Sequence, residues 1–141
     1  IKVLIMKKLL GLVLLSLLLI TSSQATEKAV YCNKVIKASD DRVFDMMKNI
    51  EIAFFIDEKN KKIRMPNPNT SVNRDVYNVK FSPEKKQIFW QLVTLNPLTN
   101  EKLVNVHFYR TDLKQFATRV HKYESDINEE NLRVWYTFQC Y

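Results

Sequence analysis

Residues 87–140 read QIFWQLVTLNPLTNEKLVNVHFYRTDLKQFATRVHKYESDINEENLRVWYTFQC, and the pattern that decides the fold lies in this stretch. Apolar and aromatic residues recur there at every second position, which is typical of strands that bury one face. The alternating residues all have even numbers: Ile88, Trp90, Leu92, Val104, Val106, Phe108, Phe116, Thr118, Val120, Leu132, Val134, Tyr136, Phe138 and Cys140. The stretch therefore predicts consecutive strands whose even-numbered side chains point inward.

The even numbering also predicts how these strands pair. In an antiparallel hairpin the numbers of paired residues add to a constant, and directly opposite side chains share a face. Turns near residues 99, 112 and 127 give sums of about 198, 224 and 254, which are all even. These sums place Trp90 opposite Phe108, Phe108 opposite Phe116, and Phe116 opposite Phe138. Because a slip by one residue would turn a strand inside out, we expect this register along the whole stretch.

The residues before 87 extend the same pattern. Residues 30–37 predict a first strand, residues 50–56 and 62–65 flank a turn at 57–61 as in a hairpin, and residues 77–81 alternate again. Together these segments predict an all-β domain, an antiparallel meander of about seven or eight strands.

Segment 39–49 is compatible with two structures. Ser39 could cap a short helix over about 40–48, because apolar residues recur at helical spacing from Val43, and a strand through 42–47 fits as well. An open sheet with this segment packed on one face is the alternative architecture.

Cys32 and Cys140 are the only two cysteines of the chain. In an oxidising compartment we expect a buried disulfide between them, with Cα atoms about 4.4–6.8 Å apart. Closing a loop of roughly a hundred residues would stabilise the fold by about 4–5 kcal/mol. The bond would also bring the first and last strands together, so the leading architecture is a small barrel or a strongly curved sheet.

The first 25 residues have the features of a secretory signal peptide. Two lysines precede the apolar run 9–20, and small and polar residues follow it up to Ala25. A membrane anchor would need about 18 or more apolar residues to cross the bilayer core. We therefore expect cleavage after Ala25, residues 1–5 as an extension of the gene model, and a single exported domain, 26–141, in the periplasm or outside the cell.

Composition excludes several classes of function. The net charge of +7 falls to +4 without the three leader lysines, and basic and acidic residues are interleaved along the chain. Such a surface is not typical of a nucleic-acid groove. The only glycine, Gly11, lies in the leader, which excludes a glycine-rich phosphate cradle in the domain. Every turn of the domain must be made by Asn, Asp, Pro, Ser or Lys.

No catalytic, cofactor or metal site is predicted. His107 and His121 fall on the odd-numbered, outward face, about 13 Å apart at about 3.3 Å per residue, which is too far to share a metal ion. Acidic pairs at 40–41 and 129–130 are typical of solvated loops. Serine and threonine residues lie outside any nucleophile motif.

The outward face of the last two hairpins is the one candidate binding patch. Arg119 should lie opposite Trp135 and His121 opposite Arg133, and a guanidinium over an indole forms a cation–π pair. Tyr109 and His107 should lie beside them. Aromatic and Arg side chains are enriched in binding surfaces, although the same residues also suit simple cross-strand stabilisation of a solvated sheet.

Several segments carry family resemblances. Tyr31-Cys32, FIDEKNKKI (55–63), FYRTDL (108–113) and Cys140 resemble a loose group of small exported β-sheet proteins of AT-rich marine bacteria. This resemblance implies an exported β-sheet protein and implies no activity. Cysteines near both ends of a small β domain are also similar to those of the periplasmic C-type lysozyme inhibitors. Those inhibitors use a loop containing Ser-Gly, which a domain without glycine lacks.

These observations predict a non-enzymatic β-barrel module in the periplasm or outside the cell. We expect it to be a monomer without a cofactor, and to bind a protein partner or a small ligand through the outer patch or the barrel mouth. The alternatives are an inhibitor of a cell-wall hydrolase and a small hydrolase that uses a pair of carboxylates.

Overall fold

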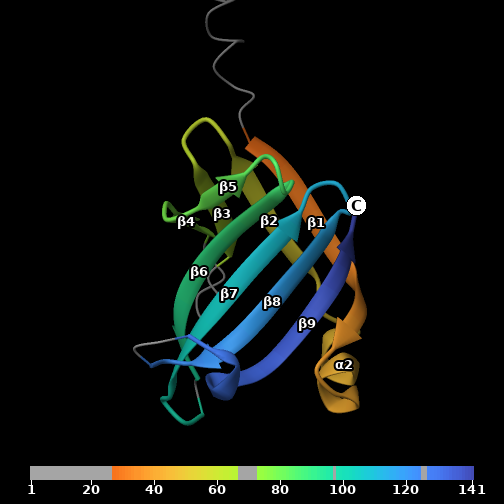
Figure 1. Cartoon of the computed structure of the whole chain (residues 1–141). Helices are drawn as coiled ribbons and strands as arrows, with labels where there is room; N and C mark the ends of the chain where they lie inside the picture. Colours follow the sequence, from red (N-terminus) through yellow and green to blue (C-terminus); the bar gives the residue numbers. More distant parts are fainter. Residues whose placement is uncertain (1–26, 67–72, 97, 125–126) are drawn as a thin grey trace, which may run out of the picture.

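The computed structural model describes residues 27–66, 73–96, 98–124 and 127–141, so the expected signal peptide and its cleavage site lie outside the described residues. Within these ranges the chain forms one antiparallel sheet and one short α-helix (Figure 1). The strands are β1 (Glu27–Ala38), β2 (Ile52–Asp57), β3 (Lys62–Pro66), β4 (Asn73–Val76), β5 (Lys80–Ser82), β6 (Gln87–Leu95), β7 (Lys102–Arg110), β8 (Gln115–Lys122) and β9 (Leu132–Cys140). No helix in this part of the chain has the length and hydropathy needed to cross a membrane.

The sheet is a meander that curls until its last strand meets its first. Its order is β4-β3-β2-β1-β9-β8-β7-β6-β5, so nearly every strand lies beside its neighbours in sequence, and β9 lies beside β1. The meander is interrupted between β4 and β5, where residues 77–79 cross from one edge of the sheet to the other. The result is a half-barrel, which confirms the predicted all-β meander and its strong curvature.

Two details of the predicted meander are wrong. The described residues form nine strands, not seven or eight, because the segment before residue 87 contributes one short strand to each edge of the sheet. Residues 77–81 do not form one strand: β5 begins only at Lys80. Val79 is buried in the core where the chain crosses the interruption, so its alternation with Tyr77 and Phe81 reflects burial rather than pairing.

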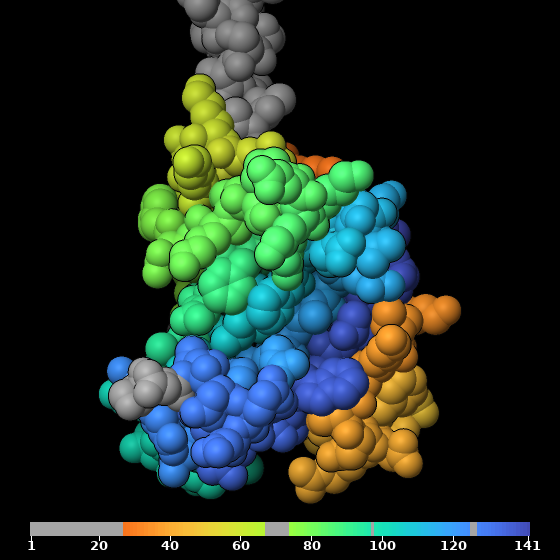
Figure 2. Space-filling view, in the orientation of Figure 1, coloured from red at the N-terminus to blue at the C-terminus, as the bar shows by residue number. Residues whose placement is uncertain are grey.

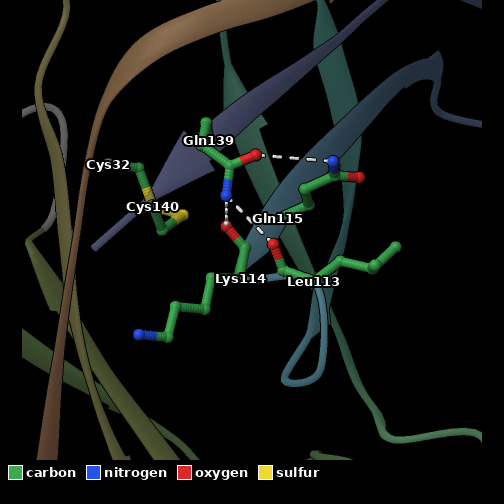
Figure 3. Close-up of a disulfide and its surroundings, with 6 residues drawn as sticks. All are labelled: Cys32, Leu113, Lys114, Gln115, Gln139 and Cys140. Carbon is green, nitrogen blue, oxygen red and sulfur yellow. Dashed lines mark hydrogen bonds between the residues drawn. A yellow bond between two sulfur atoms is a disulfide. The ribbon is translucent and has the colours of Figure 1, made fainter.

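The Cys32–Cys140 disulfide joins β1 to β9 (Figure 3). The two cysteines are partners in the strand register, both are buried, and their Cα atoms are 4.0 Å apart, slightly less than the expected range. The expected bond and its burial are thus confirmed. Beside it, Gln139 Nε2 donates to the carbonyl oxygens of Leu113 and Lys114 at 2.9 and 3.0 Å. These hydrogen bonds attach the end of β9 to the β7–β8 loop.

Bulges in β1 contribute to the curvature of the sheet. The register between β1 and β9 shifts twice, once between Cys32 and Lys34 and once between Val35 and Lys37. A bulge bends its strand and increases the local twist. Since the one glycine of the chain is Gly11, outside the described sheet, these bulges take the place of the glycine kinks that often turn a curved sheet.

Three hairpin loops place a lysine in left-handed backbone. Each loop has four residues, 58–61, 83–86 and 111–114, between the last paired residues of its strands. The fourth residue of each loop, Lys61, Lys86 or Lys114, has a φ of 50°. This region favours glycine, so lysine adopts it here at a cost of about 1–2 kcal/mol.

The even loop lengths correct the predicted register of β7. A loop with an even number of residues joins partners whose numbers add to an odd sum, whereas the predicted register has even sums. The β6–β7 loop (96–101) and the β7–β8 loop (111–114) are both even, so the odd-numbered residues of β7 face inward. The first even loop reverses the faces of β7 relative to the prediction, and the second restores the predicted faces of β8. Phe116 opposite Phe138 is therefore confirmed, while Trp90 lies opposite His107 and not Phe108.

The residues of β7 that were predicted to face inward face outward instead. The apolar pattern does not reveal this, because the outer face of β7 is also partly buried. Val104 and Val106 are buried on the outer face. Val104 lies opposite His121, whose Nδ1 is 3.1 Å from the Asn128 carbonyl oxygen in the connection between β8 and β9. This connection lies over the outer face of the sheet (Figures 1 and 2). Because both faces of β7 bury apolar residues, alternation alone does not identify the inner one.

Segment 39–49 forms helix α2 (Asp41–Met47) at the end of the half-barrel, beside β1 and β9 (Figure 1). Asp40, not Ser39, is the N-cap, because its side chain accepts a hydrogen bond from the backbone N of Val43 at 2.8 Å. Val43 is buried, and Phe44 and Met47 pack against the core. The segment is therefore a helix that joins the same core as the curled sheet.

The interior is arranged in rows of directly opposite residues. The first row holds Ile88, Tyr109, Phe116 and Phe138; the second, nearer α2, holds Trp90, His107, Thr118 and Tyr136; the third holds Leu92, Asn105, Val120 and Val134. Phe54 of β2 packs across the interior, with its ring centroid 5.3 Å from those of both Trp90 and Phe116. Aromatic packing thus fills the first two rows between β2 and the opposite strands.

Removing the disulfide should destabilise the fold strongly. We expect Cys32→Ser to lower the Tm by more than about 8 °C, because closing a loop of this size is worth about 4–5 kcal/mol and each kcal/mol moves Tm by about 4 °C. Thermal unfolding followed by circular dichroism measures the change. The Cys32→Ser/Cys140→Ser double variant should melt like the single variant. A single variant that melts like the parent would show that the bond does not hold the half-barrel together.

Glycine at a left-handed loop position should stabilise the protein. We expect Lys86→Gly to raise the free energy of unfolding by about 0.5–1 kcal/mol, since relief of the left-handed backbone exceeds the chain entropy that glycine adds. Lys85→Gly is the matched control, because Lys85 lies in the same loop without a positive φ and should lose about 0.5–1 kcal/mol. Urea unfolding compares the two. Equal losses in both variants would contradict the assigned loop geometry.

Candidate functional site

The half-barrel is hollow at the end that carries α2. A cavity of about 640 Å³ lies there between β6, β7 and β9 on one side and β2, β3 and β4 on the other. Its apolar lining includes Ile52, Met65, Leu92 and Leu103. Its polar lining includes Arg74, Thr94, Asn105, His107 and Tyr136. The interior is therefore filled towards the β7–β8 loop and open to a ligand at the opposite end.

The floor of the cavity is a row of neutral polar side chains. His107 Nδ1 lies 2.8 Å from Thr118 Oγ1, and the imidazole stacks on the Phe116 ring with 5.4 Å between centroids. Burial, assisted by the positive charge of Arg74, lowers the pKa of His107 to about 3. Burial also raises the pKa of Tyr136, although a hydrogen bond with Thr118 opposes this shift. The floor thus carries no charge at neutral pH.

Asn105 and Thr94 form the next polar group towards the mouth. Asn105 Nδ2 donates to Thr94 Oγ1 at 2.7 Å and lies 3.5 Å from the Leu92 carbonyl oxygen. Both side chains point inward because Asn105 lies opposite Leu92 and Thr94 lies opposite Leu103. This hydrogen bond holds the β6–β7 wall of the cavity.

Arg74 enters the cavity from the edge strand β4. It lies directly opposite Met65 in the register, so the two side chains share a face of the sheet. The indole Nε1 of Trp90, which points inward, donates to Met65 Sδ at 3.4 Å. Met65 and Arg74 therefore both face the interior, in agreement with the effect of the Arg74 charge on His107.

Two donor atoms of Arg74 are buried without an acceptor. Within the described residues, Nε and Nη2 of its guanidinium are inaccessible and make no hydrogen bond, and no carboxylate forms an ion pair with it. Among the described residues that line the cavity the one carboxylate is that of Glu51, which is exposed. The side chain as a whole is half-buried, and buried donor atoms in proteins are ordinarily hydrogen-bonded, because an unpaired one costs about 1–3 kcal/mol.

The predicted outer patch is only partly assembled. Arg119 does lie opposite Trp135, as predicted. Its guanidinium forms an ion pair with Glu129, however, and within the described residues it makes no cation–π contact with the indole. Trp135 remains half-buried on the outer face, beside a shallow hollow of about 350 Å³ that Phe108 also lines.

The remaining patch residues lie elsewhere. His107 and Tyr109 face the interior, which corrects their predicted outward position, because the even loops reverse the faces of β7. A register shift after Val120 places His121 opposite Leu132 instead of Arg133. Arg133 forms an ion pair with Glu101 at 3.1 Å. His121 is buried on the outer face against Asn128 and Asn131.

The two histidines lie on opposite faces of the sheet, so they cannot share a metal ion. In the described part of the chain, no three His, Cys, Asp or Glu side chains are placed to hold one.

Sequence reasoning missed the cavity residues Arg74, Asn105 and Thr94. Nothing in the alternation marks a charged or amide residue as inward-facing, because such residues ordinarily face solvent. The even loop lengths were the signal that could have located Asn105 and His107. Arg74 lies on a strand of four residues, which is too short for alternation to show which way it faces.

Comparison with protein-family models, with curated proteins and with solved structures found no match to this chain. Both family resemblances therefore stay predictions.

The buried His107 should make the free energy of unfolding depend on pH. Its pKa is about 3 in the folded protein and about 6.5 when unfolded, so the unfolded chain binds a proton that the folded protein does not. Stability should therefore fall as the pH drops from about 6.5 towards 3, by up to about 1.4 kcal/mol per pH unit from this group. Urea unfolding of the parent and of His107→Gln, from pH 7 to 4, measures the difference. Parallel pH profiles would contradict a buried neutral imidazole.

Proposed function

We propose that this protein is an exported, non-enzymatic binding module that holds a small, mainly apolar ligand in the cavity of the half-barrel. The observation that carries the proposal is the cavity itself, about 640 Å³ with apolar walls and a few converging polar groups. Ligand sites in proteins have volumes of about 300–1,000 Å³ and the same kind of lining.

Two features support export. The sequence of residues 1–25 has the order of a signal peptide. The disulfide between Cys32 and Cys140 is compatible with an oxidising compartment, where such bonds form and persist.

The polar groups of the cavity suit binding better than hydrolysis. A hydrolase with two carboxylates needs a pair of them at the reacting bond, and the described lining offers only Glu51 at the rim. An imidazole with a pKa of about 3 is a weak base at neutral pH, so His107 is poorly suited to proton abstraction.

The cavity is also a better candidate than the outer patch. Arg119 and Arg133 are engaged in ion pairs with Glu129 and Glu101, and His121 is held by the β8–β9 connection. A partner at that patch would have to displace these interactions, whereas a ligand in the cavity would fill empty volume beside Arg74, which forms no ion pair within the described residues.

Filling the cavity should abolish ligand binding. We expect the neutral fluorescent probe N-phenyl-1-naphthylamine to bind the parent saturably, and Leu103→Trp to weaken that binding at least about 10-fold, because the larger side chain occupies the cavity. Val93→Trp is the control, since Val93 is exposed on the outer face of the adjacent strand. Fluorescence titration measures both. Loss of binding in Val93→Trp alone would place the ligand on the outer face, and absence of saturable binding in the parent would refute the proposal.

A further inference from the structure

The chemistry of Arg74 indicates which ligand the cavity takes. Among the cavity-lining residues of the described chain, Arg74 carries the one positive charge, and its Nε and Nη2 are buried without acceptors. An unpaired guanidinium that lines a cavity large enough for a ligand would be stabilised by an anion that enters that cavity. A ligand can supply the missing acceptor.

The two unpaired atoms define the shape of that acceptor. Nε–H and Nη2–H lie on one edge of the planar guanidinium and point in nearly the same direction. Both atoms are covered by the protein, so the half-buried Arg74 side chain must rotate to turn this edge towards the cavity, where the two oxygens of a carboxylate then accept two parallel charge-assisted hydrogen bonds. The geometry thus favours a carboxylate over an acceptor with a single oxygen.

The charges around Arg74 limit the ligand to a single negative charge. His107 stays neutral on the floor, Glu51 is exposed at the rim, and the described lining holds no second cation. A phosphate monoester, which carries about two charges at neutral pH, would bring one buried negative charge without a partner.

The remaining lining is suited to an apolar body. Leu92, Leu103 and Met65 offer aliphatic and thioether surface beside Arg74, and Asn105 and Thr94 satisfy each other by a hydrogen bond. We propose that the cavity binds an amphipathic monocarboxylate, with its carboxylate paired to Arg74 and its apolar body along the β6–β7 wall. This inference rests on the proposed function and adds the chemical class of the ligand.

Matched ligands and matched variants test it. Isothermal titration of the full exported domain would measure the affinities of decanoate, decanol and decyl phosphate for the parent, Arg74→Met, Arg74→Lys and Arg64→Met. Arg64 is the control because it lies on the neighbouring strand β3, where it forms an ion pair with Glu27 at 2.6 Å and stacks on Phe55 at 4.3 Å. Circular dichroism would verify that each variant is folded.

We expect decanoate to bind the parent most tightly and Arg74→Met about 10- to 100-fold more weakly, the usual effect of hydrogen bonds to a charged group. Arg74→Lys should fall between them, because lysine keeps the charge but loses the planar edge. Arg64→Met should bind decanoate like the parent, and decanol should not distinguish the parent from Arg74→Met.

Two results would overturn the inference in different ways. Equal decanoate affinity in the parent and Arg74→Met, or tighter binding of decyl phosphate than of decanoate, would refute the assigned carboxylate and leave the binding cavity intact. Failure of all three ligands to bind the parent would refute the carboxylate and the proposed binding function together.

Discussion

The pairing of β1 with β9, held by the Cys32–Cys140 bond, is the constraint on which the half-barrel depends. Without it the strands would form two separate sheets, β4-β3-β2-β1 and β9-β8-β7-β6-β5, because β4 and β5 do not pair across the interruption. The bond joins two residues that are 108 apart in sequence, so it restricts the unfolded chain as well as the folded one. The bulges of β1 beside the disulfide bend the sheet where β1 pairs with β9. Gln139 attaches the end of β9 to the β7–β8 loop.

The cavity follows from the way this curled sheet is filled. Phe54 from β2 meets Trp90 and Phe116 from the opposite wall, so the rows nearer the disulfide are packed with aromatic rings. Beyond Trp90 the inward residues become smaller or more polar, as Asn105 and Thr94 show, and the two walls no longer meet. The interruption between β4 and β5 leaves Arg74 on an edge strand that faces this space. Curvature and incomplete filling together create a cavity whose described lining has one cationic side chain and an apolar wall.

The sequence predicted those features that depend on residue type or on a long alternating run, and it failed where loop geometry decides. Two cysteines in a domain expected to be exported were sufficient to predict their bond, and the alternation of β8 and β9 predicted Phe116 opposite Phe138. The predicted inner face of β7 was wrong because the residues that pair in a hairpin depend on whether its loop has an odd or even number of residues. A glycine at the left-handed position would have indicated a loop of four residues, whereas the lysines found there do not. Val104 and Val106 look like inward residues in the sequence because they are apolar. They are buried on the outer face instead, where the β8–β9 connection lies over the sheet. The inward position of Arg74 was not predicted for another reason: its strand is only four residues long, and the fold brings its charge near His107 of β7, which is distant in sequence.

The chain has two tryptophans, Trp90 on the inner face and Trp135 on the outer face, and they report directly on where a ligand binds. The Trp90 indole N–H donates to Met65, which lines the cavity, whereas Trp135 lies opposite Arg119 in the outer patch. The most direct measurement is therefore a two-dimensional proton–nitrogen NMR titration of the domain, residues 26–141, with decanoate, in which both indole N–H signals are followed. Binding inside the half-barrel predicts that the Trp90 signal moves in a saturable manner while the Trp135 signal stays in place. Movement of the Trp135 signal with an unchanged Trp90 signal would contradict a ligand site in the half-barrel.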